Sequence, residues 1–223
     1  MLYPVLSCLP FTAYNIIPLY GMAAWGWDPF QLLIFYWCET VILAFWTMVR
    51  IRLLPMSSLG KLTVNGRVTR GTYANMIGFF SLHSGAFIFA HLFFLLALFS
   101  GDWFKRLHGV SDFFRTFFVD SGAWIGLAIG FMSGGVTAMS GPYRPRLVNS
   151  LIRGFGFMPP PSPPEDGRDR VGIIVGSLYG RIVTLQLALI FGAMLASAWG
   201  SAAPLYIVVA LKTAIDVLPR AIR

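Results

Sequence analysis

Apolar stretches, each about the length of a bilayer-spanning helix, alternate with short polar connections along the whole chain. A spanning helix needs about 20 predominantly apolar residues, and stretches of roughly 17–25 residues qualify. The pattern predicts an all-α, polytopic transmembrane helix bundle in which residues 1–223 form a single domain. The six expected spans are residues 4–25, 29–50, 75–99, 122–140, 172–196 and 203–219.

Three of the polar connections have a recognisable character. Between the first two spans the connection is very short, and we expect Asp28 to be the N-cap of a helix with Pro29 in its first turn. Residues 103–118 mix aromatic with charged side chains, which predicts an amphipathic helix along the outer membrane surface. Residues 158–170 are rich in proline and charge, and this indicates a mobile cytoplasmic linker.

Positively charged side chains gather in alternate connections. Because cytoplasmic loops of membrane proteins carry an excess of Lys and Arg, we expect a multi-pass membrane protein with both termini in the cytoplasm. The residues concerned are Arg50, Arg52, Lys61, Arg67 and Arg70 after the second span, Arg144, Arg146, Arg153, Arg168 and Arg170 after the fourth, and Arg220 and Arg223 at the C-terminus.

Composition supports a lipid environment. The chain is 57% hydrophobic and 12% charged, whereas a soluble domain has about 25% charged residues. Its net charge of +8 lies beside the apolar segments, where it fits contact with anionic headgroups rather than with nucleic acid. The two cysteines, Cys8 and Cys38, both fall in expected spans and are interpreted as unpaired small hydrophobic residues.

Six ionisable side chains interrupt the apolar stretches. A charge within hydrocarbon costs about 2.5–3.5 kcal/mol on insertion scales, so such residues usually face a protein interior or a water-filled cavity. They mark the candidate functional site. The six are Glu39, His83, His91, Arg181, Lys212 and Asp216.

Glu39 lies in the middle of the second span, with Tyr36 three residues before it on the same helix face. A carboxyl group at that depth either ionises beside a cation or stays protonated, because desolvation disfavours its charged form. It is either a proton relay or ligand, or a structural partner of Arg181 or Lys212. Lys212 also has Asp216 four residues later, and an internal pair between these two is the simplest interpretation of that spacing.

The remaining candidates are consistent with more than one role. Arg181 is too deep in the fifth span to reach water easily, so it either pairs with an internal acid or clamps a carboxylate or phosphate of a substrate. His83 and His91 are eight residues apart on one helix, which disfavours a shared metal ion. We therefore expect no metal site and no cofactor. Each histidine is interpreted as a hydrogen-bonded core residue, and the alternative is a separate role in binding haem or a metal or in a proton path.

Small residues recur at four-residue spacing in two spans. Such stripes let helices approach closely in lipid. Tight packing within the monomer is the simpler interpretation, and a homodimer seam is the alternative. The stripes comprise Gly122, Gly126, Gly130 and Gly134 in the fourth span, and Gly172, Gly176 and Gly180 in the fifth.

Three functional classes agree with this pattern. If the second, third, fifth and sixth spans adjoin, the polar residues other than His91 line one cavity that opens to the cytoplasm, and the protein binds or conducts a small polar solute or a proton. In the second class, it is an intramembrane enzyme with Glu39 or His83 as acid or base. In the third, it is an accessory subunit of a larger membrane complex and the buried charges are structural.

Short motifs spread over most of the chain carry a resemblance to a known family. They are Asn15-Ile16-Ile17-Pro18-Leu19, Gly26-Trp27, Tyr36-Trp37-Cys38-Glu39, His83-Ser84-Gly85-Ala86-Phe87, Tyr179-Gly180-Arg181-Ile182-Val183 and Lys212-Thr213-Ala214-Ile215-Asp216. The chain resembles an uncharacterised family of six-helix membrane proteins of bacteria and archaea. The resemblance implies the fold, a location in the inner membrane of a prokaryote and the same polar residues, and it implies no activity. That family commonly has Asn after the glutamate and a His near position 186, where this chain has Thr40 and Gln186, so a metal site built on that histidine is not expected here.

Overall fold

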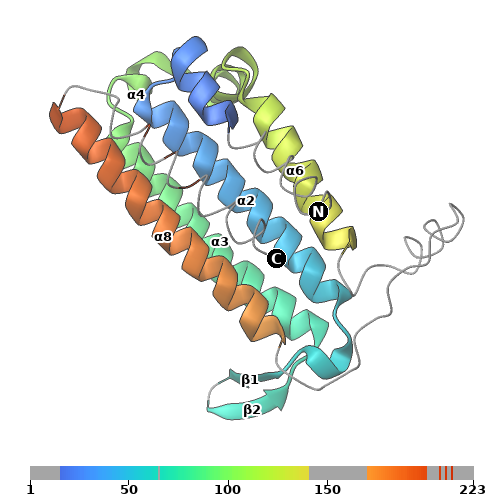
Figure 1. Ribbon diagram of the computed structural model, residues 1–223. Coiled ribbons are helices and arrows are strands. Elements are labelled where there is room, and N and C mark those ends of the chain that lie inside the picture. The colour runs from blue at the N-terminus through green and yellow to red at the C-terminus, as the bar shows by residue number, and fades with distance from the viewer. Residues whose placement is uncertain are drawn as a thin grey trace, which may run out of the picture. The chain divides into compact units, whose positions relative to one another are not determined.

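The computed structural model describes residues 16–64, 66–140 and 170–199, together with residues 206, 209 and 212. These residues are mostly helical and belong to two compact units, one drawn from Met1–Val41, Ile88–Ser133 and Arg181–Arg223 and the other from Ile42–Phe87 and Gly134–Gly180. The elements (Figure 1) are a helix over 16–24, α2 (Pro29–Leu53), a 3-10 turn (Met56–Ser58), β1 (Lys61–Val64), β2 (Arg67–Arg70), α3 (Tyr73–Phe99), α4 (Trp103–Arg106), α5 (Val110–Phe114), a π-helical turn η2 (Arg115–Asp120), α6 (Ala123–Ser140) and α8 (Arg170–Trp199).

The expected apolar spans fall on helices wherever the structure describes them. Among the described residues, α2 and α3 are long and apolar enough to cross a membrane, with mean hydropathies of 1.8 and 2.0. A third span is added if Val110–Asp120 and Ala123–Met139, which meet at an angle of 80°, are taken together. Residues 4–15 of the first expected span and most of the last one lie outside the described residues.

Helix α3 carries a long, exposed apolar surface. Only 11% of its most apolar stretch is buried, and large side chains such as Leu82, Phe89 and Phe93 are exposed along it. Scattered exposed hydrophobic residues are ordinary, whereas a continuous apolar face marks contact with lipid or a partner.

The start of α2 follows the expected cap. The Gln31 backbone N–H donates to Asp28 Oδ1 at 2.8 Å, and the Asp28 N–H donates to Gln31 Oε1 at 3.0 Å. This reciprocal arrangement is a capping box, which satisfies two backbone donors at a helix N-terminus. The second carboxylate oxygen of Asp28 accepts the Trp103 indole N–H at 2.6 Å, so the cap also holds the segment that follows α3.

The core of the first unit is built around the N-terminal half of α2. Leu32, Leu33 and Tyr36 are almost completely buried there. Two indole groups fix its edges, since Trp27 Nε1 donates to the Ser121 carbonyl and Trp37 Nε1 donates to the Ile88 carbonyl, both at 2.9 Å. Cys38 is a buried free thiol, as expected, and Cys8 lies outside the described residues.

The segment expected to be one amphipathic helix over 103–118 is instead broken. Residues 103–106 and 110–120 are helical, and Leu107 ends the first of these turns in an extended conformation. Trp103 and Phe113 both pack against Phe117, with ring centroids 4.8 Å apart in each contact. Burial of this aromatic cluster against Phe30 and Ile34 accounts for the break, because one straight helix presents a single stripe.

The second unit contains a small β-hairpin that an all-α interpretation did not include. Strands β1 and β2 pair antiparallel, with Lys61 opposite Arg70 and Val64 opposite Arg67. The turn holds Gly66 at φ +74°, a conformation that glycine adopts without strain. The sequence Asn65-Gly66 between two alternating runs is a strong short-range hairpin signal, and it was available in the chain.

Candidate functional site

A buried ion pair joins two of the predicted polar residues in the first unit. The Lys212 Nζ donates to Glu39 Oε1 at 3.0 Å, across 173 positions of sequence. The side chains are 2% and 7% exposed, respectively, so water screens neither charge. Removing two charges from water is costly, and only good geometry between them offsets that cost.

An aromatic ring of α2 lies against the lysine of this pair. The Lys212 ammonium lies 4.9 Å from the centre of the Tyr36 ring, within the range of a cation–π interaction. Tyr36 precedes Glu39 by three residues, so one helix face presents both the acid and the ring to the cation. Thr40 is buried beside them and its hydroxyl donates to the Tyr36 carbonyl at 3.1 Å.

The position of Lys212 follows from its own helix face. Tyr206, Val209 and Lys212 are helical at three-residue spacing, which places them along one side. Val209 is completely buried in the cluster formed by Leu32, Tyr36 and their neighbours. Burial of Val209, one turn before Lys212, therefore places the Lys212 ammonium group beside Glu39.

One oxygen of the pair retains unused hydrogen-bonding capacity. Glu39 Oε2 is buried and has no hydrogen-bond partner among the residues that the structure describes. An ionised carboxylate accepts about four hydrogen bonds, so this oxygen is chemically open to a proton, a water molecule or a donor group of a solute. The pair thus keeps one open acceptor oxygen beside its buried contact.

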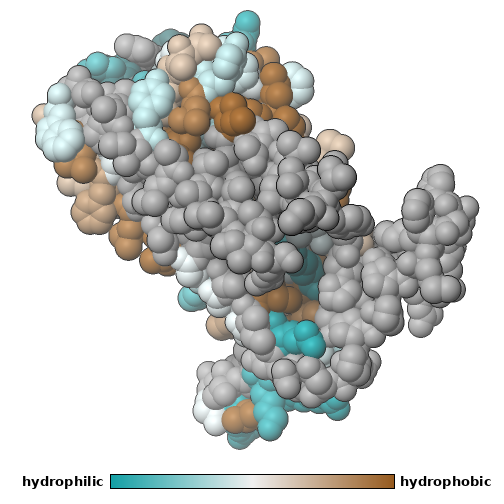
Figure 2. Space-filling view, viewed as in Figure 1, coloured by the Kyte–Doolittle hydropathy of each residue, from teal (hydrophilic) through white to brown (hydrophobic). Residues whose placement is uncertain are grey.

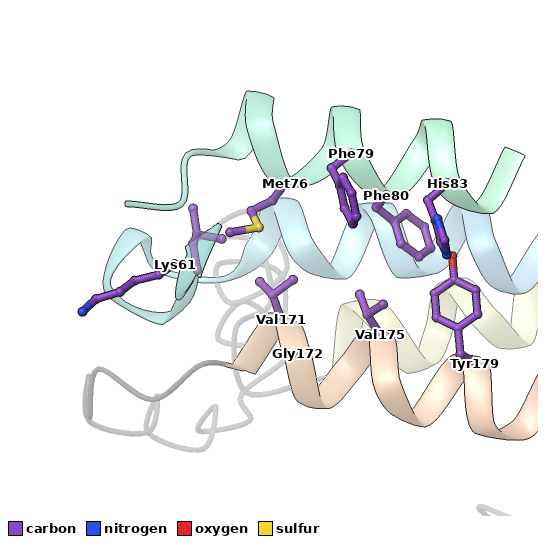
Figure 3. A pocket seen from close by; sticks show the side chains of 10 residues that line it. Lys61, Met76, Phe79, Phe80, His83, Val171, Gly172, Val175 and Tyr179 are labelled. Atoms are coloured by element: carbon purple, nitrogen blue, oxygen red, sulfur yellow. The ribbon is translucent and has the colours of Figure 1, made fainter. Parts of the chain in front are cut away.

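The second unit holds a separate pocket of about 180 Å³. Its walls come from the start of α3, the start of α8 and the segment that leads into β1 (Figure 3). The lining is mostly apolar, with a few polar groups at its ends. The residues are Leu59, Lys61, Met76, Phe79, Phe80, His83, Val171, Gly172, Val175 and Tyr179.

His83 lies at one end of this pocket and not in a buried core. Its imidazole is stacked on Phe79 with ring centroids 5.8 Å apart and meets the Tyr179 ring at 5.5 Å. The Tyr179 hydroxyl is buried without a hydrogen-bond partner among the described residues. Tyr179 was not predicted as a site residue, although it lies two positions before Arg181 in the motif Tyr179-Gly180-Arg181-Ile182-Val183.

The remaining predicted residues are only partly placed. His91 is half-buried on α3, where its ring stacks with Phe94 at 6.5 Å. Arg181 is part of α8, but its side chain falls outside the description, as does Asp216 entirely. Glu39 and His83 belong to different units. Within the described ranges, no group of three or more His, Cys, Asp or Glu side chains is arranged to hold a metal ion.

The two glycine stripes have different surroundings. In α6, a Cβ at Gly126 would meet Phe35 at 2.9 Å, and one at Gly122 or Gly134 would meet the indole of Trp25 or Trp46. Aromatic rings therefore occupy the space that these glycines leave. The three stripe glycines of α8, Gly172, Gly176 and Gly180, are exposed, and among the described residues a Cβ at Gly176 or Gly180 would meet no atom within 4 Å.

The described residues form a mostly helical protein. Two of its helices are long and apolar enough to span a membrane, and it holds a buried carboxylate–ammonium pair. The chain belongs to a family of unknown function, DUF6498, whose model matches residues 2–142 and 164–222. Neither a curated protein nor a solved structure matches the chain.

Proposed function

We propose that this protein is a six-span protein of a prokaryotic inner membrane, with both termini in the cytoplasm, that binds or conducts a small polar solute or a proton at Glu39 and Lys212. The exposed apolar face of α3 supports the membrane location, because lipid is the solvent that such a face requires. The alternation of Lys- and Arg-rich connections supports the orientation.

The observation that carries the functional part is the buried Glu39–Lys212 pair with one carboxylate oxygen left open. Charged residues at membrane depth are costly, and they commonly mark ion or substrate pathways. An ion pair kept for stability alone brings no advantage over well-packed apolar residues of the same volume. Its presence in an apolar helix therefore favours a role that needs the charges.

The pair has a simple route for exchange. A proton that binds Glu39 neutralises the carboxylate and weakens its hold on Lys212, whose ammonium group then keeps the Tyr36 ring as a neighbour. A polar solute with both a donor and an acceptor can replace each partner in the same way. Protonation adds one positive charge to the buried site, whereas a neutral solute changes its hydrogen bonds and not its charge.

Proton flux into proteoliposomes tests this function. Vesicles loaded with the pH-sensitive dye pyranine contain wild type, the double variant Glu39→Leu/Lys212→Met, or Arg67→Gln as an exposed-charge control. We expect an imposed pH gradient to decay faster with wild type and Arg67→Gln than with the double variant. Equal decay in all three, together with unchanged binding of polar solutes in a thermal-shift screen, would overturn the proposal.

The rival function is that of an accessory subunit in which the pair only fastens helices. The direct 3.0 Å contact and the deep burial of the pair also agree with this structural role. The two functions differ in the effect of an apolar replacement, because a purely structural pair is replaceable by apolar residues without a change in proton flux. The same double variant therefore separates the two.

A further inference from the structure

The described residues of the second unit carry charge of one sign. They include six cations, Arg50, Arg52, Lys61, Arg67, Arg70 and Arg170, and no acidic side chain. In sequence, no Asp or Glu occurs between Glu39 and Asp102. Figure 2 shows hydrophilic side chains gathered over the β1–β2 hairpin. The hairpin therefore presents three exposed cations, Lys61, Arg67 and Arg70, with no acidic side chain near them in sequence, and we expect it to attract anions.

Two of these cations occupy opposed positions in the hairpin. Lys61 and Arg70 are direct cross-strand partners, and both are exposed. Side chains at such positions lie on the same face with Cβ atoms about 5 Å apart, and like charges there are destabilising. An anion between them removes that repulsion. Arg67, the cross-strand partner of Val64, lies three positions before Arg70 on β2. Because successive side chains of a strand alternate between its faces, Arg67 lies on the face opposite to Lys61 and Arg70.

The pocket of the second unit begins at this same lysine. Lys61 lines one end of it, and its side chain extends away from the cavity (Figure 3). From there the apolar walls continue along α3 from Met76 to His83, a length of about 10 Å at 1.5 Å per residue. The pocket thus has a cationic end at Lys61 and mostly apolar walls, and these walls are called the slot below.

We propose that this pocket binds part of one acyl chain of an anionic phospholipid whose phosphate lies on Lys61 and Arg70. A free phosphate ion would use the two cations and leave the apolar slot without a role. A zwitterionic lipid would fill the slot and gain little from the cations. An anionic lipid uses both features, and it is the charged component of the cytoplasmic leaflet, where the basic loops are expected.

The contact of the lipid phosphate with the cations supplies most of the affinity, and the apolar pocket determines where the acyl chain lies. An acyl chain gains little free energy on leaving other lipid tails, because they are as apolar as the pocket wall. Each Lys or Arg near a charged membrane surface contributes about fivefold in binding. The inference rests on the membrane location proposed above and not on the Glu39–Lys212 site.

Lipid binding to the purified full chain, followed by native mass spectrometry, tests the headgroup contact. We expect phosphatidylglycerol to bind more tightly than phosphatidylcholine of the same chain length, and Lys61→Gln/Arg70→Gln to lose about 25-fold of that affinity. Arg67→Gln, on the other face of the same hairpin, should lose less than fivefold. Equal affinities for the two lipids, or equal losses in the double variant and Arg67→Gln, would overturn the proposal, as would full competition by inorganic phosphate.

A photoreactive phosphatidylglycerol with a diazirine on its acyl chain tests whether the chain enters the pocket. We expect cross-links to Phe79, Phe80 and Val175, and their loss in Val175→Trp. Cross-links that lie only outside the pocket would overturn the acyl-chain position. Prior reconstitution into phosphatidylcholine nanodiscs separates the two proposals, because a chain that fails to insert refutes the membrane location, whereas an inserted chain that does not select phosphatidylglycerol refutes only lipid binding.

Discussion

At the residue scale, the account depends on two charges that are buried together. Glu39 and Lys212 are each less than 8% exposed, and Tyr36 covers the ammonium group with its ring. Breaking a buried pair leaves one uncompensated charge, whereas replacing both members leaves none. Single and double substitutions at these positions therefore have opposite consequences for stability.

We predict that Lys212→Met alone lowers the free energy of unfolding by about 3–5 kcal/mol, because Glu39 is then buried without its partner. The double variant Glu39→Leu/Lys212→Met should be as stable as wild type or more stable, by about 1–4 kcal/mol. Thermal unfolding in detergent, followed by circular dichroism, measures both. A double variant that is less stable than the single one would contradict the pairing.

At this scale the sequence indicated which charged residues interrupt the apolar stretches but not which of them meet. Glu39 and Lys212 were recognisable because a charge within an apolar stretch is costly, and Tyr36 was recognisable by its spacing of three residues from Glu39. Lys212 had two acidic candidates, Asp216 on its own helix and Glu39 far away in sequence. The choice between them depends on which helices pack together, and no local pattern encodes that. Tyr179 went unrecognised for the same reason, since its contact with His83 crosses from α8 to α3.

At the element scale, the helices follow directly from hydropathy, and the departures follow from local turn chemistry. The expected spans 29–50 and 75–99 became α2, Pro29–Leu53, and α3, Tyr73–Phe99, because long apolar runs leave the backbone no better way to satisfy its polar groups. The hairpin at Lys61–Arg70 came from a signal of only two residues within a basic loop, which hydropathy does not register.

The cap of α2 gives a prediction at this scale. Asp28→Ala removes both the cap of Gln31 and the acceptor of the Trp103 indole, and it should lower the free energy of unfolding by about 2 kcal/mol. Asp28→Asn keeps a side-chain oxygen for the cap and should lose less than half of that. Thermal unfolding of the two variants beside wild type measures the difference, and equal losses would argue against the capping box.

The glycine stripes give a matched pair of variants. A methyl group at Gly126 would lie 2.9 Å from the Phe35 ring, so Gly126→Ala should destabilise by about 1–3 kcal/mol through overpacking. Gly176 has open space around it, and Gly176→Ala should stabilise α8 by up to about 1 kcal/mol, since alanine favours helix over glycine. Chemical unfolding in mild detergent compares the two. Destabilisation by Gly176→Ala would instead indicate that a second copy packs against that stripe.

At the scale of the whole molecule, the chain has few charged residues. Most of them lie in the connections, apart from Glu39, Arg181, Lys212 and Asp216, and α3 carries a long exposed apolar face. The membrane location stays a prediction, whereas helices long and apolar enough to span a membrane were predictable from hydropathy. The activity was not, because hydropathy and charge describe the solvent of a protein and say nothing of the solute that it recognises.

The proposed orientation is tested with reporter fusions in a bacterial host. A fluorescent protein fused after Arg223 should fluoresce, because it folds in the cytoplasm, and alkaline phosphatase at the same position should be inactive. Phosphatase fused within the connection before Pro29 should be active. Active phosphatase at the C-terminus would contradict the even number of spans or their direction.

Infrared difference spectroscopy of the reconstituted protein tests the central claim most directly, namely that Glu39 exchanges a proton within the folded structure. Spectra are taken as the pH is lowered over the range in which the fold persists, for wild type and for Glu39→Gln. We predict a protonated-carboxyl band that appears reversibly in wild type and is missing in Glu39→Gln. Identical difference spectra for the two proteins would mean that the Glu39–Lys212 pair stays locked, and would contradict the account.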